Sequence, residues 1–199
     1  MPFYMDALTH ILAGFGLSGA AGLNAWLPLL IVGLADRYTN LLNLQGPYAV
    51  LAQPLVLGIL GVLLLVEVVA DKVPAVDSIN DAIHTLIRPA AGAILFAANA
   101  NAFGHMDSGL AMVFGLLAAG SIHAVKATTR PLVTAGTAGT GNFVVSTLED
   151  VLAATVAILA LLAPALAIAL LALCVFGAWR GGRAVKGRVL GFRAKPGRA

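Results

Sequence analysis

The sequence predicts an all-α integral membrane protein, a compact bundle of about five to six transmembrane segments with broken or re-entrant half-helices. Of its 199 residues, 60% are hydrophobic and only 11% are charged, whereas roughly a quarter are charged in soluble domains. The mean hydropathy is +0.94. Because the apolar residues also gather in long stretches, we expect one transmembrane domain over residues 1–180.

Five apolar stretches are the candidate membrane spans: Leu8 to Ala35, Val50 to Ala70, Pro89 to Ala102, Gly109 to Val125 and Val151 to Trp179. Four glycines before Pro28 in the first stretch favour close helix packing, and Pro28 should bend or break its helix. The last stretch would be about 43 Å long as one helix. It is therefore either a tilted helix kinked at Pro164 or a tight hairpin.

The chain after the last stretch is strongly basic. From Arg180 onward it has seven basic residues and no acidic one. By the positive-inside rule, residues 181–199 should form a basic cytoplasmic tail close to anionic lipid headgroups, and we expect no nucleic-acid partner.

Three connecting segments have turn-forming residues. Residues 36–49 and 99–108 read as loops. Residues 128–150 are rich in Gly and Thr, and irregular backbone at membrane depth must face protein or a water-filled cavity. This segment is therefore expected to lie near a polar pathway.

A polar stripe follows the second stretch. Asp77, Asp81, His84 and Arg88 are 4, 3 and 4 residues apart, which places them on one face of a helix. Pro89 should end that helix, which predicts a half-helix over residues 78–88. Transporters often build binding sites from such half-helices.

The other ionisable residues form three groups: His123, Lys126 and Arg130; Glu67 and Asp71; and Glu149 and Asp150. The first group shares one helix face, and the last is expected at the start of a helix, where negative charge is favourable. A charge at the centre of a span costs about 2.5 to 3.5 kcal/mol on insertion scales, so these residues need partners or water. We expect the acidic stripe of Asp77 and Asp81 to complement Lys126 and Arg130.

Short internal similarities suggest a duplication, because "SINDAIHTL" from Ser78 resembles "TLEDVLAAT" from Thr147. Four motifs, "SGAAGLNAWLPLLIVGLA", "VADKVPAVDSINDAIHTLIRPAAGA", "HAVKATTRPLV" and "NFVVSTLEDVLA", together resemble the bacterial membrane proteins catalogued as domain of unknown function 4126. The resemblance covers roughly residues 15–165. It implies a multi-pass protein of the bacterial inner membrane and carries no catalytic residues over.

The preferred functional hypothesis is a small transporter or channel for an ion or small solute, with His84 and His123 as candidate proton carriers. One alternative is a membrane scaffold whose charges only fix helix packing. Another is a membrane metalloprotein, suggested by the D-x-x-H at Asp81 and His84, although no second such motif occurs. The sequence predicts no cofactor and no metal, favours no enzyme class, and is compatible with a homo-oligomer.

Overall fold

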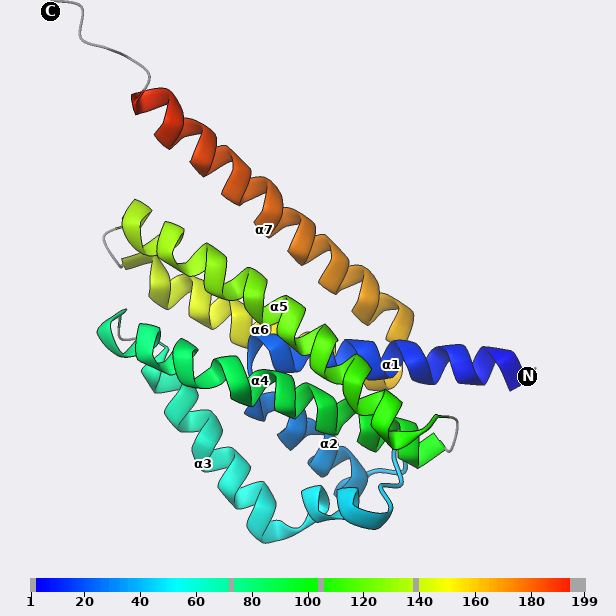
Figure 1. Ribbon diagram of the computed structural model, residues 1–199. Helices are drawn as coiled ribbons and strands as arrows, with labels where there is room; N and C mark the ends of the chain where they lie inside the picture. Colours follow the sequence, from blue (N-terminus) through cyan, green and yellow to red (C-terminus); the bar gives the residue numbers. More distant parts are fainter. Residues whose placement is uncertain (1–2, 72–73, 104–105, 138–139, 194–199) are drawn as a thin grey trace, which may run out of the picture.

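The computed structural model describes residues 3–71, 74–103, 106–137 and 140–193 (Figure 1). Within these ranges every regular element is helical. In order, the helices are α1 (Phe3–Leu23), α2 (Trp26–Tyr38), the 3-10 helix η1 (Gly46–Ala52), α3 (Pro54–Ala70), α4 (Pro74–Phe103), α5 (Ser108–Thr137), α6 (Thr140–Leu162) and α7 (Pro164–Arg193).

Helix α1 lies at the centre of the bundle and packs against α4, α5, α6 and α7 (Figure 1). Its glycines allow this close approach: a Cβ at Gly16 would lie 2.8 Å from the Cβ of Ala160, and one at Gly22 would lie 2.5 Å from the carbonyl oxygen of Ala119. Helices α4 and α5 form the most extensive helix pair, and a Cβ on Gly115 would clash with the carbonyl of Gly92. Small residues therefore set the spacing of the helices, as in many membrane bundles.

The first apolar stretch is broken, which confirms the prediction, but the break lies four residues before Pro28. Helix α1 ends at Leu23 and α2 begins at Trp26. The side-chain oxygen of Asn24 accepts hydrogen bonds from the backbone N–H groups of Trp26, at 3.2 Å, and Leu27, at 3.0 Å. Pro28 lies in the first turn of α2, where its missing N–H breaks no helical bond.

The prediction of a half-helix ending at Pro89 is wrong. Helix α4 runs without a break from Pro74 to Phe103 and includes Pro89. Its tight packing along α5 compensates for the hydrogen bond that proline removes. The predicted loop over residues 99–108 is correspondingly too long, because its first five residues belong to α4.

The prediction of irregular structure over residues 128–150 is also wrong. Helix α5 continues to Thr137, and α6 begins at Thr140. The threonine hydroxyls donate to carbonyls one turn back: Thr128 to Ala124 at 2.9 Å and Thr137 to Val133 at 2.7 Å. Both side chains are exposed on the surface of the bundle, and each hydroxyl is satisfied by its own helix, so threonine does not mark a loop here.

The last apolar stretch forms two helices that turn back on each other. Helix α6 ends at Leu162, α7 begins at Pro164, and the two helices pack together (Figure 1). Proline suits the first helical position because its missing N–H has no helical partner there. The hairpin alternative is the one that forms, and α7 extends to Arg193, into the region predicted as the tail.

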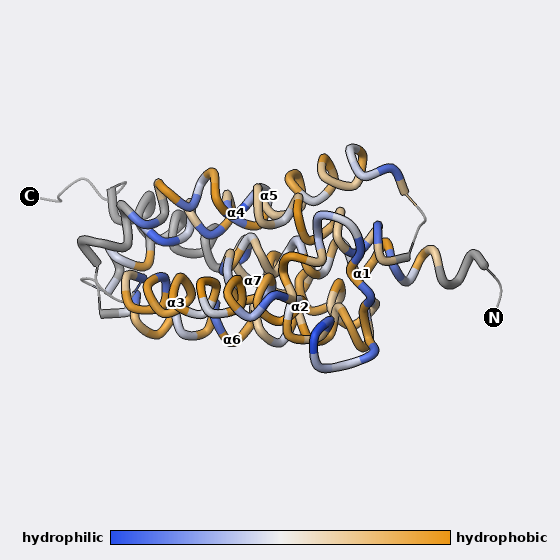
Figure 2. Tube along the Cα trace, turned by 90° about the horizontal axis from the view of Figure 1, so that it is seen from below, coloured by the Kyte–Doolittle hydropathy of each residue, from blue (hydrophilic) through white to orange (hydrophobic). Residues whose placement is uncertain are grey.

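The helices have the apolar character of a membrane protein. By length and composition, Ser108–Pro131 and Gly141–Leu162 can each cross a membrane, and the pair Gly46–Ala52 and Pro54–Ala70, bent by 65°, makes a third candidate. Two shorter apolar helices are Ala7–Leu23 and Pro164–Ala178. Figure 2 shows α3 and α6 as mostly hydrophobic, and large side chains such as Leu55 and Leu86 are exposed on the outside of the bundle. These outward-facing apolar surfaces suit lipid.

Candidate functional site

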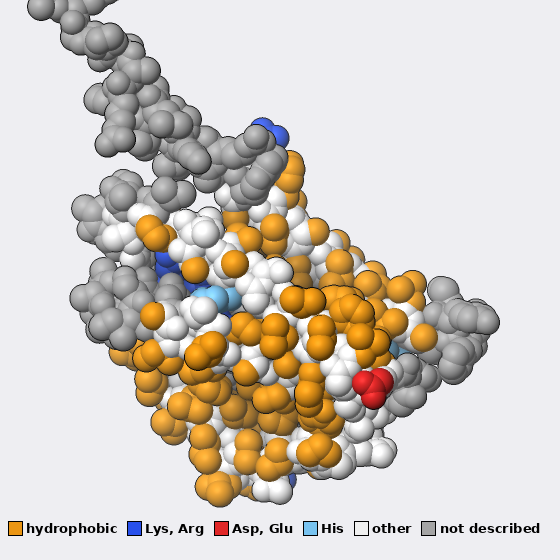
Figure 3. Space-filling model, in the orientation of Figure 1, with side chains coloured by type: hydrophobic (Ala, Val, Ile, Leu, Met, Phe, Trp, Pro, Cys, Tyr) orange, Lys and Arg blue, Asp and Glu red, His pale blue; other side chains and the backbone are white. Residues whose placement is uncertain are grey.

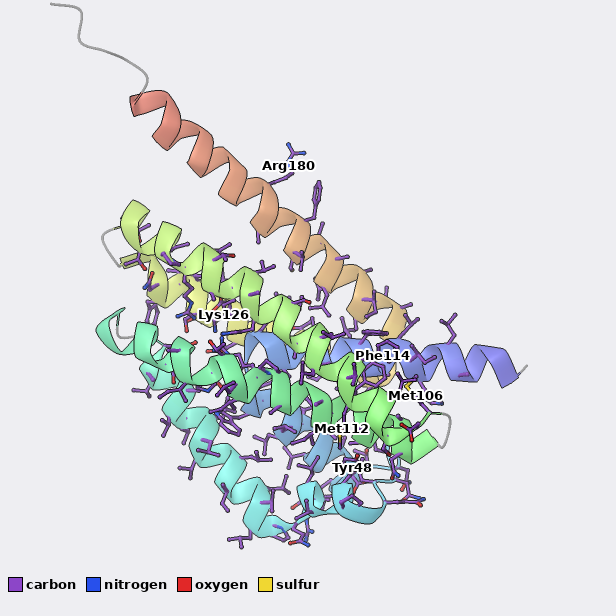
Figure 4. All side chains as sticks on the ribbon, viewed as in Figure 1. Tyr48, Met106, Met112, Phe114, Lys126 and Arg180 are labelled. Carbon is purple, nitrogen blue, oxygen red and sulfur yellow. The ribbon has the colours of Figure 1, made fainter. Side chains whose placement is uncertain are left out.

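Six charged side chains from four parts of the fold meet inside the bundle. We call them the charged cluster: Glu67 of α3, Asp71 directly after α3, Arg88 of α4, Lys126 and Arg130 of α5, and Glu149 of α6. Five of the six are buried, and Arg88 is fully inaccessible. Figure 3 shows Lys or Arg and His side chains in a depression of an otherwise hydrophobic face, and Figure 4 labels Lys126 between the ribbons. Three positive and three negative groups balance one another.

Asp71 is the centre of one half of the cluster. Its Oδ2 atom lies 3.1 Å from Lys126 Nζ and 3.0 Å from Arg130 Nη2. Glu149 Oε2 bridges the same two cations, at 3.1 Å from Lys126 Nζ and 2.6 Å from Arg130 Nη2. Two carboxylates therefore share two cations, in a geometry with short charge-assisted hydrogen bonds.

The end of α1 contributes to the same site through its backbone. The carbonyl of Leu23 is left without a helical partner by the break, and it accepts a hydrogen bond from Lys126 Nζ at 3.1 Å. A cation at the C-terminus of a helix is also favoured by the helix dipole. Nearby, Asn24 Nδ2 donates to Asp150 Oδ1 of α6 at 3.0 Å.

Arg88 is the centre of the other half. Its Nη2 atom donates to Glu67 Oε1 at 2.8 Å, and its Nη1 atom lies 2.9 Å from Nδ1 of His123. Arginine only donates, so His123 Nδ1 accepts, and the imidazole hydrogen is on Nε2. That hydrogen points to the hydroxyl of Thr85 at 3.1 Å. The contacts of His123 thus require a neutral ring.

His84 lies on the other side of Glu67. Its Nδ1 atom is 2.8 Å from the carbonyl oxygen of Asn80, and its Nε2 atom is 3.6 Å from Glu67 Oε1. The side-chain amide of Asn80 donates to Asp71 Oδ1 at 2.7 Å. The ring of Trp26, at the start of α2, packs edge-on to the His84 ring with 6.2 Å between centroids.

A cavity of about 130 Å³ opens beside the charged cluster between α1, α5, α6 and α7. Lys126, Thr129 and Glu149 contribute its polar lining, and the remaining wall is apolar, including Leu152 and Cys174. An engineered apolar cavity of about 150 Å³ binds benzene, so this space suits a small ion with water or an organic solute of about six heavy atoms.

Most of the predicted site residues come together. Eight of them lie in one connected network: Glu67, Asp71, His84, Arg88, His123, Lys126, Arg130 and Glu149. Asp150 bonds to Asn24, the residue that follows the Leu23 carbonyl bound by Lys126. The side chains of Asp77 and Asp81 lie outside the described part of the structure, so their predicted pairing with the basic stripe stays a prediction.

One predicted placement is wrong: Glu149 and Asp150 are not at the start of a helix but in the middle of α6. The predicted site contains only charged residues and histidines, so it misses three neutral residues of the site: Asn24, Asn80 and Thr85. Only Asn24 has a sequence signal, since it is an amide in the middle of an apolar run. Among the described residues, no group of three or more His, Cys, Asp or Glu side chains is arranged to hold a metal ion.

Comparisons with known proteins give a family and no functional relative. Neither the curated proteins nor the solved structures contain a match to the chain. Residues 11–183 match one family, which confirms and extends the resemblance seen in the four motifs. The chain belongs to the family described as "Domain of unknown function (DUF4126)".

Proposed function

We propose that this protein is a small transporter or channel that moves an ion or small solute across the membrane and uses the charged cluster as its site. The observation that supports it best is the sharing of Lys126 and Glu149 between the cluster and the adjacent cavity. A solute in the cavity lies beside Lys126 and Glu149, which otherwise bond to each other.

The energetic cost of the cluster favours a functional role. Each charge costs about 2.5 to 3.5 kcal/mol at the centre of a span, and apolar residues often replace a buried ion pair without loss of stability. A cluster of six charges is therefore an expensive way to join helices. In a transporter the same groups have a second use, because they exchange partners when a solute binds.

We also propose which membrane contains the protein and on which side its C-terminal region lies. The protein has about five to six spans in the bacterial inner membrane, with the shorter apolar segments Ala7–Leu23 of α1 and Pro164–Ala178 of α7 among them. The basic C-terminal region lies on the cytoplasmic side, where Lys and Arg are retained and anionic headgroups attract them.

Flux through proteoliposomes tests the proposal. The probes are imposed K⁺, Na⁺ and Cl⁻ gradients, read with a potential-sensitive dye, and a set of small organic solutes read by vesicle swelling. Lys126→Gln should abolish the flux seen with the wild type, because it removes the cation shared by cluster and cavity. Arg37→Gln, at an exposed cation of α2, is the matched control and should retain it. Equal flux in folded Lys126→Gln protein would contradict the site.

One observation favours a second candidate, a membrane scaffold: each charge of the cluster lies within 4 Å of an opposite charge. If the charges only join helices, exchanging Lys126→Glu with Glu149→Lys should restore folding, and none of the probes should cross the membrane. If any of these ions or solutes crosses the membrane with wild-type protein and not with the exchanged variant, the scaffold hypothesis is contradicted.

A further inference from the structure

His84 is held in one tautomer by its own helix. Its Nδ1 atom lies 2.8 Å from the Asn80 carbonyl, which only accepts hydrogen bonds, so Nδ1 must carry a hydrogen. In a neutral ring Nε2 then has none and is itself an acceptor. Nε2 is buried, and no described residue forms a hydrogen bond with it.

The atom opposite Nε2 is also an acceptor. Glu67 Oε1 lies 3.6 Å away, and both side chains are nearly inaccessible, with 6% and 1% of their surfaces exposed. The second oxygen of the carboxylate, Oε2, likewise has no hydrogen-bond partner among the described residues. Two buried acceptors therefore face each other with no hydrogen between them, which is unfavourable unless a proton is added.

The other buried histidine of the network has no such vacancy. His123 Nδ1 accepts from Arg88, and its Nε2 hydrogen points to Thr85. A proton added at Nδ1 would set two donors, the ring N–H and the guanidinium N–H, against each other at 2.9 Å. Of these two rings, only His84 has a ring nitrogen ready to accept a proton.

We infer that Glu67 and His84 form a proton-binding site. The lone pair of Nε2 forms a new N–H bond to a proton from hydronium, whose O–H bond breaks to leave a water molecule, and the imidazolium then donates to Glu67 Oε1. No electron is transferred. The ion pair replaces an acceptor-to-acceptor contact with a charge-assisted hydrogen bond.

The charged surroundings can accommodate the added charge. Around the pair, α3 and its end supply Glu67 and Asp71, α4 supplies Arg88, and α5 supplies His123 and Lys126, whereas Trp26 of α2 is uncharged. Because Arg88 Nη2 also lies 3.9 Å from Asp71 Oδ2, it can share its charge with Asp71 when His84 binds Glu67. Proton binding at His84 therefore loosens the bond between Arg88 and Glu67.

This inference rests on the proposed function in one respect: it makes the proton the coupling ion of the transporter. Proton uptake changes the partners of Arg88, and Asp71 connects Arg88 to Lys126 at the cavity. The binding of the proton itself does not require that any solute moves.

The fluorescence of Trp26 tests the proton site without a flux assay. Imidazolium quenches indole fluorescence at close range, and the two rings are in edge-on contact, with 6.2 Å between centroids. The chain has two tryptophans, so Trp179→Phe leaves Trp26 as the single reporter. In this background, lowering the pH from roughly 8 to 5 should reduce the fluorescence in one transition.

Three variants identify the group that titrates. His84→Gln should abolish the transition, and Glu67→Gln should alter it because the imidazolium loses its counter-charge. His10→Gln, at a histidine in α1 about 20 Å from the break along the helix, is the matched control and should leave the transition unchanged. An unchanged transition in folded His84→Gln protein would overturn the proposal.

A second measurement needs no variant at His84. In wild-type protein labelled with ¹⁵N-histidine, one ring should keep its Nδ1 hydrogen while Nε2 titrates; the absence of such a ring would overturn the proposal even if His84→Gln fails to fold. If the protein shows flux but the fluorescence of Trp26 does not change with pH, the proton site is refuted and the proposed function is not. If the fluorescence changes with pH but no probe crosses the membrane, the proposed function is refuted and the proton site is not.

Discussion

Arg88 and Glu67 should behave as one energetic unit, which a double-mutant cycle measures. Arg88→Met leaves Glu67, with 1% of its side chain exposed, without its cation, and removing one partner of a buried pair costs about 3 to 5 kcal/mol. Glu67→Gln should cost less, because Arg88 still has Asp71 within 3.9 Å. The double variant restores the charge balance, with two cations and two carboxylates left.

The double variant should therefore lose far less stability than the two single losses added together. Its main remaining cost is the missing donor to His123 Nδ1, about 1 to 3 kcal/mol for an unsatisfied buried acceptor. The expected coupling is near the upper end of the usual range for contacting residues, about 3 kcal/mol.

Reversible unfolding in mixed micelles, followed by far-UV circular dichroism, gives the four free energies of the cycle. Arg37→Met is the control: it removes an exposed cation and its exposed hydrogen bond to the Ala52 carbonyl, so it should change stability by no more than about 1 kcal/mol. A double variant whose loss equals the sum of the single losses would show that the pair is not an interacting unit and would refute the reasoning.

Two more predictions concern helix packing and the break after α1. In thermal unfolding followed by circular dichroism, Gly115→Leu should destabilise the fold by about 1 to 3 kcal/mol, because its side chain meets the Gly92 carbonyl. Gly58→Ala, with open space around it, should be neutral or stabilising in that assay. Asn24→Asp should lower the melting temperature by placing a carboxylate against Asp150, and adding Asp150→Asn should restore it; no restoration would show that this contact does not govern the break.

Helical spacing identified most of the site because it depends only on which residues share a face. His123, Lys126 and Arg130 are 3 and 4 residues apart, and all three point into the bundle. Spacing does not predict which residues of other helices lie opposite that face. The carboxylates opposite Lys126 are Asp71 and Glu149, from two other elements, and no local pattern connects them with α5.

Local propensity misplaced the helix ends for a related reason. Pro89 and the threonines of α5 are helix-breaking signals in water, where an exposed backbone group can bond to solvent. Within an apolar bundle a broken helix leaves unsatisfied groups, so tertiary packing keeps α4 continuous and the hydroxyls bond to their own helix. Where the chain does break, at Asn24, a side chain and Lys126 satisfy the freed groups.

The break and the charged cluster are therefore one feature of the molecule. The carbonyl that binds Lys126 exists as a free acceptor only because α1 ends at Leu23, and Asn24 connects the start of α2 to Asp150 of α6. A movement of α2 relative to α1 must change these bonds. It must also change the ring contact between Trp26, at the start of α2, and His84 of α4. In a scaffold, Lys126 must keep its three partners: the Leu23 carbonyl, Asp71 and Glu149. In a transporter, Lys126 must exchange one of these partners for a solute. The two candidate functions thus make opposite demands on the same few bonds, and flux through proteoliposomes that contain wild-type or Lys126→Gln protein separates them.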